Sequence, residues 1–543
     1  MLFNSSIFIF GFLPISLSAC FILARISGPR AAQISLIVAS LGFYTYWNPS
    51  YLPLLVLSIV FNYSVAAAMA RVGSKIHRRY LLFFAIVFDL SLLGYYKYAS
   101  FFLGAFNTAT GADFAIPAIL LPLGISFYTF QQLTLLADIS NEGAAQRVRF
   151  HHFLLFVIFF PHLIAGPIVH HREMMPQFEK ADYRFRWENL AVGGSLFAMG
   201  LFKKAAMADG IAAYVSPLYA NASAGHRLSL VYAWAAAFGF LLQMYFDFSG
   251  YSEMALGLAR MVGIKLPINF NSPLKATSIT DHWSRWHMTL TRFLREYLYT
   301  PMTMSLTRRR KSKGKGGIGG SKATAGAFLS LIALPSLITM FLAGLWHGAG
   351  YQFLVWGLLH GLYISVNQGW RLVSPCIWPN RERYYRVMRP IGFILTLLCV
   401  VMAIPFFRAD SLATASNVFS GMIFCNGVEL PAIVENRLPA LGTALAQLGV
   451  VFVPSGLTDL MMIWLWIAAL LLIAVIPPNV IEILRNFEPV SSLPSTITVG
   501  RDSGLFRLLT LRFSLSWAVA VGLTLALALV CLPQPTSFIY FNF

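Results

Sequence analysis

Long apolar stretches recur along this chain and limit what it can fold into. A helix crosses a hydrocarbon core of about 30 Å with roughly 20 predominantly apolar residues. Stretches of that kind fall near residues 4–24, 32–47, 51–70, 80–104, 116–137, 150–169, 188–203, 228–248, 325–346, 351–368, 389–407, 459–477 and 513–532. The pattern predicts an all-α integral membrane protein with about 11–13 helices, some of them re-entrant or interfacial.

Charge is scarce, and its distribution predicts the orientation in the membrane. Only 11% of the 543 residues are charged, and the mean hydropathy is +0.68, whereas soluble domains carry roughly a quarter charged residues. The net charge of +19 does not indicate a nucleic-acid partner, because Lys and Arg lie in short loops, where they retain a loop in the cytoplasm. These basic loops are residues 25–30, 71–79, 307–322 and 371–389. We therefore predict a polytopic membrane protein with the N-terminus, the turn 47–49 and residues 533–543 outside.

The chain is expected to form one polytopic membrane domain over residues 1–543, because no soluble segment is long enough to fold alone. The first apolar segment lacks a basic start and a small-residue cleavage site, which predicts a retained span rather than a signal peptide. The five cysteines show neither pairing nor metal-ligand spacing. We interpret them as packing residues: Cys20, Cys376, Cys399, Cys425 and Cys531.

The first departure from plain spanning helices is the segment 159–168. Pro161, Gly166 and Pro167 interrupt an apolar run just before His170 and His171. Helix breaks at membrane depth are tolerated only where protein or water satisfies the freed backbone groups. The break therefore predicts the lining of a cavity.

The second departure runs over residues 269–304. Within it, the segment 281–297 reads as one helix, with Asp281 and Arg285 four residues apart and so adjacent on its surface. An apolar stripe follows the same segment. Its members are Trp283, Trp286, Leu290, Phe293, Leu294 and Tyr297. Such a helix is expected at the membrane interface or inside the bundle, with its tryptophans at headgroup level.

The third departure is the glycine-rich basic segment 307–322, which contains no acidic residue. Its composition predicts a flexible cytoplasmic loop close to anionic lipid. Recruitment of an anionic acyl donor, such as a coenzyme or an acyl-carrier protein, is the alternative interpretation.

Two histidines stand apart from the other nine. His347 and His287 each follow a tryptophan directly, Trp346 and Trp286, and neither has an evident aqueous exit. An ionisable side chain at membrane depth lines a cavity or a reaction path by default. A neutral imidazole there can take a proton from a hydroxyl that attacks an activated acyl carbon. Neighbouring glycines (Gly344, Gly348 and Gly350) would let backbone or substrate approach closely.

The remaining histidines have simpler explanations. His360 lies thirteen residues after His347, which on a continuous helix would place it on the opposite face. Interfacial solvation at span ends explains six more, namely His77, His151, His152, His170, His171 and His226.

Acidic residues inside the spans are further candidates. Asp247 and Tyr251 are four residues apart and are predicted to share a helix face, either to orient a histidine or substrate hydroxyls or as a buried structural pair. No His/Asp/Glu cluster shows the i, i+4 ligand spacing of a helical zinc motif, and no Gly-x-Ser-x-Gly elbow occurs. We expect neither a metal centre nor covalent serine chemistry.

Taken in order, several of these segments resemble the membrane-bound O-acyltransferase family, in its bacterial branch that modifies alginate and teichoic acid. The matching segments are residues 121–132, 160–168, 245–252, 269–301 and 345–349. The resemblance covers roughly residues 40–410. Residues 411–543, predicted to form C-terminal helices with a long polar segment near 478–512, depart from the family pattern.

The resemblance implies a ring of helices around a central funnel, with the family's active-site histidine falling on His347 and its second histidine on His287. Candidates for the lining of the tunnel are Asp247, Tyr251, Trp346, Trp286, Gln132 and His162. It also implies O-acyl transfer, most readily O-acetyl transfer, from a cytoplasmic acetyl-coenzyme A or acyl-carrier thioester to a polysaccharide. No cofactor would be bound permanently, and a separate exported hydrolase-like protein would be the partner.

Two other classes of function are compatible with the sequence. Broken helices and buried polar residues also mark transporters of small acyl compounds or glycan precursors, although the paired breaks in two halves that such folds show are not seen. A non-catalytic scaffold of a polysaccharide export complex is the second alternative, and it leaves the Trp346-His347-Gly348 sequence unexplained.

Overall fold

The computed structural model describes residues 1–142, 149–318, 324–454, 457–492, 509–532 and 538–539. The chain forms two compact units. Unit 1 comprises Met1–Ala205, Phe248–Asn269 and Val480–Asn542, and unit 2 comprises Ala206–Asp247 and Phe270–Asn479.

Unit 1 is built from helices of the first 205 residues and short elements near the end of the chain. Its helices are η1 (Phe8–Phe12), α1 (Leu13–Ile26), α2 (Pro29–Thr45), η2 (Pro49–Tyr51), α3 (Leu52–Arg71), α4 (Lys75–Leu93), η3 (Gly94–Tyr98), α5 (Ala99–Thr110), α6 (Ile125–Glu142), α7 (Phe150–Ile158), α8 (Phe160–Leu163), α9 (His171–Lys180), α10 (Trp187–Phe202), α24 (Val480–Ile483), η8 (Arg485–Phe487) and α27 (Leu515–Val530). Two further helices, η4 (Lys203–Ala208) and α12 (Leu230–Met261), contribute residues to both units.

Unit 2 contains the helices of the middle of the chain and one pair of short strands. Its elements are α11 (Asp209–Ser223), η5 (Pro273–Lys275), α13 (Ile279–Trp283), α14 (Met288–Leu294), η6 (Arg295–Tyr299), α15 (Thr300–Ser312), α16 (Ala325–Phe328), η7 (Leu329–Ala333), α17 (Leu334–His347), α18 (Tyr351–Ile377), α19 (Arg381–Arg408), α20 (Leu412–Met422), β1 (Val428–Pro431), α21 (Ala432–Arg437), α22 (Pro439–Gln447), β2 (Val450–Val453) and α23 (Leu457–Val475).

Eight helical stretches among the described residues are long and apolar enough to cross a membrane. They are Phe8–Ile26, Pro49–Arg71, Lys75–Thr110, Trp187–Ser223, Leu230–Met261, Ala325–His347, Arg381–Arg408 and Thr458–Val475. The predicted class, an all-α multi-pass membrane protein, is thereby confirmed. The central funnel stays a prediction.

Prolines shorten two of the expected spans. The stretch expected over 116–137 becomes helical only at Ile125, because Pro117 and Pro122 lack the N–H that a helix interior requires. The stretch expected over 150–169 divides into α7 and α8 at Phe159, whose ψ of 108° lies outside the helical range. This division at Phe159 agrees with the helix break predicted from Pro161.

Two expectations for residues 269–322 are corrected by the structure. The single helix expected over 281–297 is interrupted at His287, which adopts a left-handed conformation (φ 41°, ψ 55°) between α13 and α14. The loop expected from residue 307 begins only after Ser312, because the basic run 308–311 is still part of α15. Its flexibility stays a prediction. Residues 319–323 lie outside the described part of the chain.

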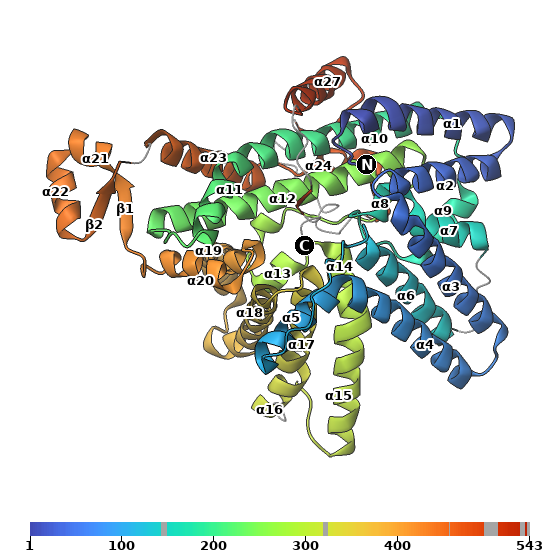
Figure 1. Ribbon diagram of the computed structural model, residues 1–543, viewed down its shortest axis with the longest axis horizontal. Helices are drawn as coiled ribbons and strands as arrows, with labels where there is room; N and C mark the ends of the chain where they lie inside the picture. Colours follow the sequence, from blue (N-terminus) through green and yellow to red (C-terminus); the bar gives the residue numbers. More distant parts are fainter. Residues whose placement is uncertain (143–148, 319–323, 455–456, 493–508, 533–537, 540–543) are drawn as a thin grey trace. The chain divides into compact units, whose positions relative to one another are not determined.

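The region after residue 410 contains a feature that was not predicted. Strands β1 and β2 pair in parallel, with Val428 opposite Val450 and Pro431 opposite Val453, and α21 and α22 connect them. Figure 1 shows these four elements in orange at the left of the view, beyond α20. In the polar segment 478–512, residues 493–508 lie outside the described residues.

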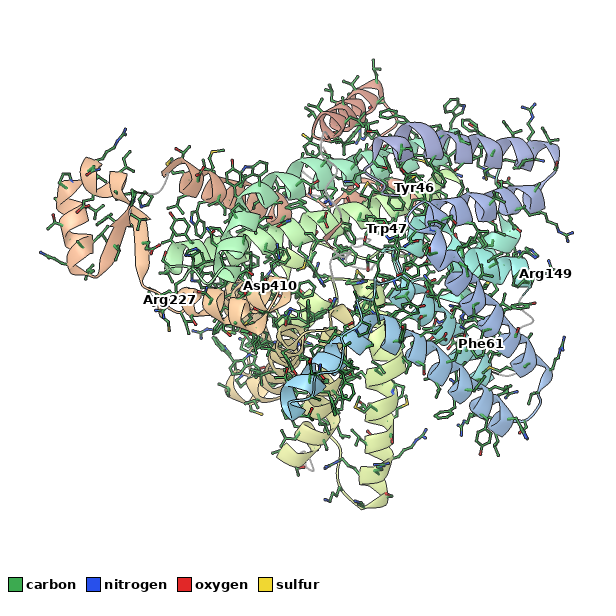
Figure 2. The ribbon with its side chains drawn as sticks, viewed as in Figure 1. Tyr46, Trp47, Phe61, Arg149, Arg227 and Asp410 are labelled. Carbon is green, nitrogen blue, oxygen red and sulfur yellow. The ribbon has the colours of Figure 1, made fainter. Side chains whose placement is uncertain are left out.

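Short connections in both units are fixed by side-chain hydrogen bonds. After α2, where Figure 2 labels Tyr46 and Trp47, the side chain of Asn48 accepts a hydrogen bond from the Ser50 backbone N–H at 2.9 Å and begins η2. Between α19 and α20, Asp410 accepts a hydrogen bond from the Ser223 hydroxyl of α11. The Asn48 bond is a cap, which satisfies a backbone N–H that the start of a helix leaves open.

Candidate active site

His347 is the last residue of α17, and close packing of α17 against α18 fixes its position. A Cβ atom built on Gly344 would lie 2.2 Å from the Phe353 carbonyl oxygen, and one built on Gly357 would lie 2.3 Å from the Met340 carbonyl oxygen. Real Cβ atoms do not come so close, so the two backbones can approach only because both positions are glycine. Of the two roles expected for Gly344, the structure shows the approach of a backbone.

The His347 imidazole lies in an aromatic cluster of unit 2. Its exposed fraction is 5%. The ring centroids of Trp356 and Phe407 each lie 5.0 Å from that of His347, both in edge-to-face orientation. Trp346 is 4.8 Å away. Aromatic neighbours on several sides restrict the imidazole to few orientations.

His287 reaches the same cluster from a strained turn. Its positive φ of 41° is a conformation that residues other than glycine rarely adopt, so the surrounding packing must hold it. The side chain is 1% exposed, and Phe270 stacks on it at a centroid distance of 6.4 Å. Burial lowers the pKa of His287 to about 3, because the charged form loses its hydration. The imidazole is therefore neutral at physiological pH.

Trp346 packs near both histidines. Its ring centroid is 6.3 Å from that of His287 and 4.8 Å from that of His347. Trp286 joins the same group, because it packs edge-to-face with Phe270 at 5.1 Å. The structure thus brings together both histidines singled out from the sequence and the tryptophan that precedes each of them.

His360 also belongs to this cluster, which its spacing from His347 did not indicate. The Trp283 indole N–H donates a hydrogen bond to His360 Nδ1 at 3.3 Å. Trp356 links this pair to His347, with centroid distances of 4.8 Å to His360 and 5.0 Å to His347. The opposite face expected on a continuous helix does not apply, because α17 ends at His347 and α18, which begins at Tyr351, packs back against it. The spacing of Trp356 and His360, four residues apart on one helix, was the available signal.

Asp247 lies in unit 2 on α12 and is fully buried. Tyr245, two residues before it, packs against Trp286 and Phe270 at centroid distances of 6.4 Å each. The α12 segment that carries Asp247 therefore borders the aromatic cluster within unit 2.

The three other candidates lie in unit 1: Gln132, His162 and Tyr251. The Gln132 side-chain amide donates to the Ser58 hydroxyl at 3.0 Å and to the Tyr128 carbonyl at 3.1 Å. Its neighbour Gln131, rather than Gln132, lies beside His162, with 3.5 Å between Gln131 Nε2 and His162 Nδ1. His162 is completely buried, and its Nε2 has no hydrogen-bond partner among the described residues.

The ring of Tyr251 stacks with two phenylalanine rings within unit 1. Phe3 stacks on it at 4.7 Å and Phe538 at 4.6 Å. Aromatic packing of this kind stabilises the position of α12. The ring of Tyr251 therefore has a packing role, whatever its hydroxyl contributes.

One group of possible metal ligands forms in unit 1, although no metal-ligand spacing was visible in the sequence. The ligand atoms of Asp138, His170 and His171 lie within 4.8 Å of one another. The group joins α6 to the start of α9. Spacing patterns did not reveal it, because more than thirty residues of sequence separate Asp138 from the histidines.

Fold and site together define a multi-pass helical membrane protein in which two buried histidines share one aromatic cluster. Comparison with known families agrees: the model of the membrane-bound O-acyltransferase (MBOAT) family matches residues 31–316. The chain belongs to this family and is an O-acyltransferase. The matched range includes His287 and ends before His347.

Curated relatives extend the likeness over most of the chain. The peptidoglycan O-acetyltransferase of Helicobacter pylori is 40% identical over 457 residues, which cover 79% of this chain and 81% of that protein. The probable alginate O-acetylase of Pseudomonas aeruginosa is 34% identical over 449 residues, 81% of this chain and 78% of that protein. The teichoic acid D-alanyltransferase of Bacillus subtilis is 28% identical over 249 residues, 45% of this chain and 58% of that protein.

Proposed function

We propose that this protein transfers an acetyl group from a thioester donor to hydroxyl groups of a cell-envelope or exported polysaccharide. The observation that carries the proposal is the arrangement of His287, Trp346 and His347 in one buried cluster of a membrane-bound O-acyltransferase. The names of two relatives above 30% identity, a peptidoglycan O-acetyltransferase and a probable alginate O-acetylase, both specify the O-acetyl group. The relative named for D-alanyl transfer covers less than half of the chain.

His347 acts as the general base in this proposal. Its neutral imidazole takes the proton of the acceptor hydroxyl while that oxygen attacks the thioester carbonyl carbon. A carbon–oxygen bond forms and the carbon–sulfur bond breaks. The departing sulfur then takes the proton from the imidazolium, which releases a thiol and regenerates neutral His347.

His287 positions the acyl group. Because its imidazole is neutral and buried, it can donate one hydrogen bond without adding a charge to the site. A donor aimed at the thioester carbonyl would stabilise the negative charge that develops on its oxygen.

His287→Asn is the informative variant of this residue, because asparagine tolerates a positive φ better than most residues do. We expect kcat/KM to fall by about tenfold, the loss of one hydrogen bond, while the thermal stability stays close to that of the wild type. His287→Gly is the second test variant, since it keeps the backbone conformation and removes the whole side chain. Wild-type kinetics in both variants would remove His287 from the site.

The donor, the partner and the orientation complete the proposal. We infer acetyl-coenzyme A as the donor, on the cytoplasmic side of a bacterial inner membrane, with both chain termini outside. An exported hydrolase-like protein would complete transfer to the polysaccharide. Mass analysis of envelope glycans from cells with and without this gene tests the proposal: O-acetyl groups should be lost with the gene and restored by the wild-type copy. Unchanged acetylation would contradict it.

Access to His347 from water is a separate expectation of the proposal. In a chain whose five cysteines are replaced, His347→Cys in sealed vesicles should react with a small water-soluble thiol reagent, and acetyl-coenzyme A should slow the reaction. Ala343→Cys is the matched control, because Ala343 lies one turn earlier on α17 and is 1% exposed. If the His347→Cys variant reacted no faster than the control variant, with the reagent on either side, the expected passage would be absent.

A further inference from the structure

The group formed by Asp138, His170 and His171 has an unusual geometry for a membrane helix bundle. Three side chains converge on one carboxylate oxygen. Asp138 Oδ2 lies 2.9 Å from His170 Nε2, 3.6 Å from His171 Nδ1 and 3.8 Å from an Arg172 guanidinium nitrogen. The Asp138 and His170 side chains are 13% and 15% exposed, so the described residues do not enclose the group completely.

Within the described part of the chain, His171 is buried without hydrogen bonds to its ring nitrogens, which ordinary packing does not explain. It is 2% exposed, and neither of its ring nitrogens has a hydrogen-bond partner among the described residues. Burying two unsatisfied polar nitrogens costs about 1–3 kcal/mol for each group left without a partner. A metal ion that accepted the lone pair of one nitrogen would remove part of that cost.

We propose that Asp138, His170 and His171 bind one divalent transition-metal ion, with zinc favoured by the donor set. Two imidazole nitrogens and one carboxylate oxygen are ligands that zinc uses commonly, and a water molecule would complete a tetrahedron. The atoms are now within 4.8 Å of one another. Ligands at the usual zinc distances of about 2.0–2.2 Å lie closer together than that, so small side-chain rotations have to close the group.

Two neighbours must adjust when the ion binds. Arg172 is 51% exposed, so its guanidinium can turn to solvent and leave the carboxylate to the metal. His170 now accepts a hydrogen bond from the Arg172 backbone N–H through Nδ1, at 3.3 Å. For Nε2 to offer its lone pair, the ring proton has to move to Nδ1, and this long contact is lost.

The consequence for the fold is local to unit 1. Asp138 lies near the end of α6, and the two histidines begin α9 after the broken segment 159–169. A metal ion between them would fasten that segment at its C-terminal side, where helix hydrogen bonds are missing. The role inferred here is structural, and it does not depend on the acyl-transfer proposal. It also departs from the absence of a metal centre that the sequence spacing led us to expect.

Metal content decides the matter. The full-length protein, purified in detergent with its affinity tag removed, is loaded with zinc chloride, desalted and analysed by elemental mass spectrometry. We expect about one zinc ion per chain, and a melting temperature several degrees higher with zinc than after chelation. Wild-type protein that retained no zinc after desalting would overturn the proposal.

Variants locate the ion. Asp138→Asn and His171→Gln should each retain little zinc and lose the zinc-dependent rise in melting temperature. His77→Gln is the matched control, because His77 is exposed on α4 and is not part of the group. If the two cluster variants retained as much zinc as His77→Gln, the ion would be bound elsewhere and the assignment would be wrong. Should one of the two cluster variants fail to fold, the zinc content of the other tests the site.

Discussion

Purified His347→Ala should fold normally and transfer acyl groups about 10²- to 10⁴-fold more slowly than the wild type, the usual contribution of a general base. The reason is that no other side chain in the described cluster occupies the same position at the end of α17. His360, another imidazole of the aromatic cluster, already accepts the Trp283 indole hydrogen bond through Nδ1. The rate is measured with a labelled acetyl thioester and a soluble acceptor glycan.

The control for this variant has to separate chemistry from folding. His77→Ala removes an exposed histidine and should leave the rate unchanged. The melting temperature of His347→Ala should stay within a few degrees of the wild type, although the ring contacts with Trp356 and Phe407 are lost. Full activity in a folded His347→Ala protein would defeat the assignment of the general base.

Gly344→Ala should be among the most destabilising single-methyl substitutions in this chain. The new Cβ would meet the Phe353 carbonyl oxygen at 2.2 Å, and a backbone atom cannot rotate away as a side chain can. The helices α17 and α18 would have to separate, at a cost of about 3 kcal/mol. Because His347 ends α17 one turn later, activity should fall together with stability.

Gly522→Ala is the matched control for this effect. Gly522 lies inside α27, and a Cβ built there has nothing within 4 Å. Alanine favours a helix over glycine by up to about 1 kcal/mol, so this variant should be neutral or slightly more stable. Thermal unfolding in detergent compares the two. Equal stability of the two variants would show that α17 and α18 are not held together through Gly344.

Much of the fold could be predicted from the sequence, because hydrophobic length and the scarcity of charge follow directly from the lipid environment. The break near Pro161 was predictable for a similar reason, since proline removes a backbone donor. The interruption at His287 was not. Asp281 and Arg285 form the expected i, i+4 ion pair at 2.7 Å, although α13 already ends at Trp283. Local spacing alone gives no sign of that end.

Of the candidate site, the sequence identified His347 and His287 through their neighbouring tryptophans and their apolar surroundings. It missed His360 and the group of Asp138, His170 and His171, because these residues meet only through tertiary packing. The strands β1 and β2 were missed for another reason: each is only four residues long, too short for an alternating pattern to stand out.

The stacking of Tyr251 between Phe3 and Phe538 has a practical consequence for handling this protein. Phe3 and Phe538, near the two ends of the sequence, both stack on this ring. The position of α12 therefore depends on residues that expression designs commonly trim or fuse. Deleting either phenylalanine would remove one stacking partner from the buried side chain of Tyr251, which belongs to this 32-residue helix. Fusion tags should therefore be joined through spacers, and end-trimmed versions should be checked for enzyme activity before any loss is blamed on the histidines.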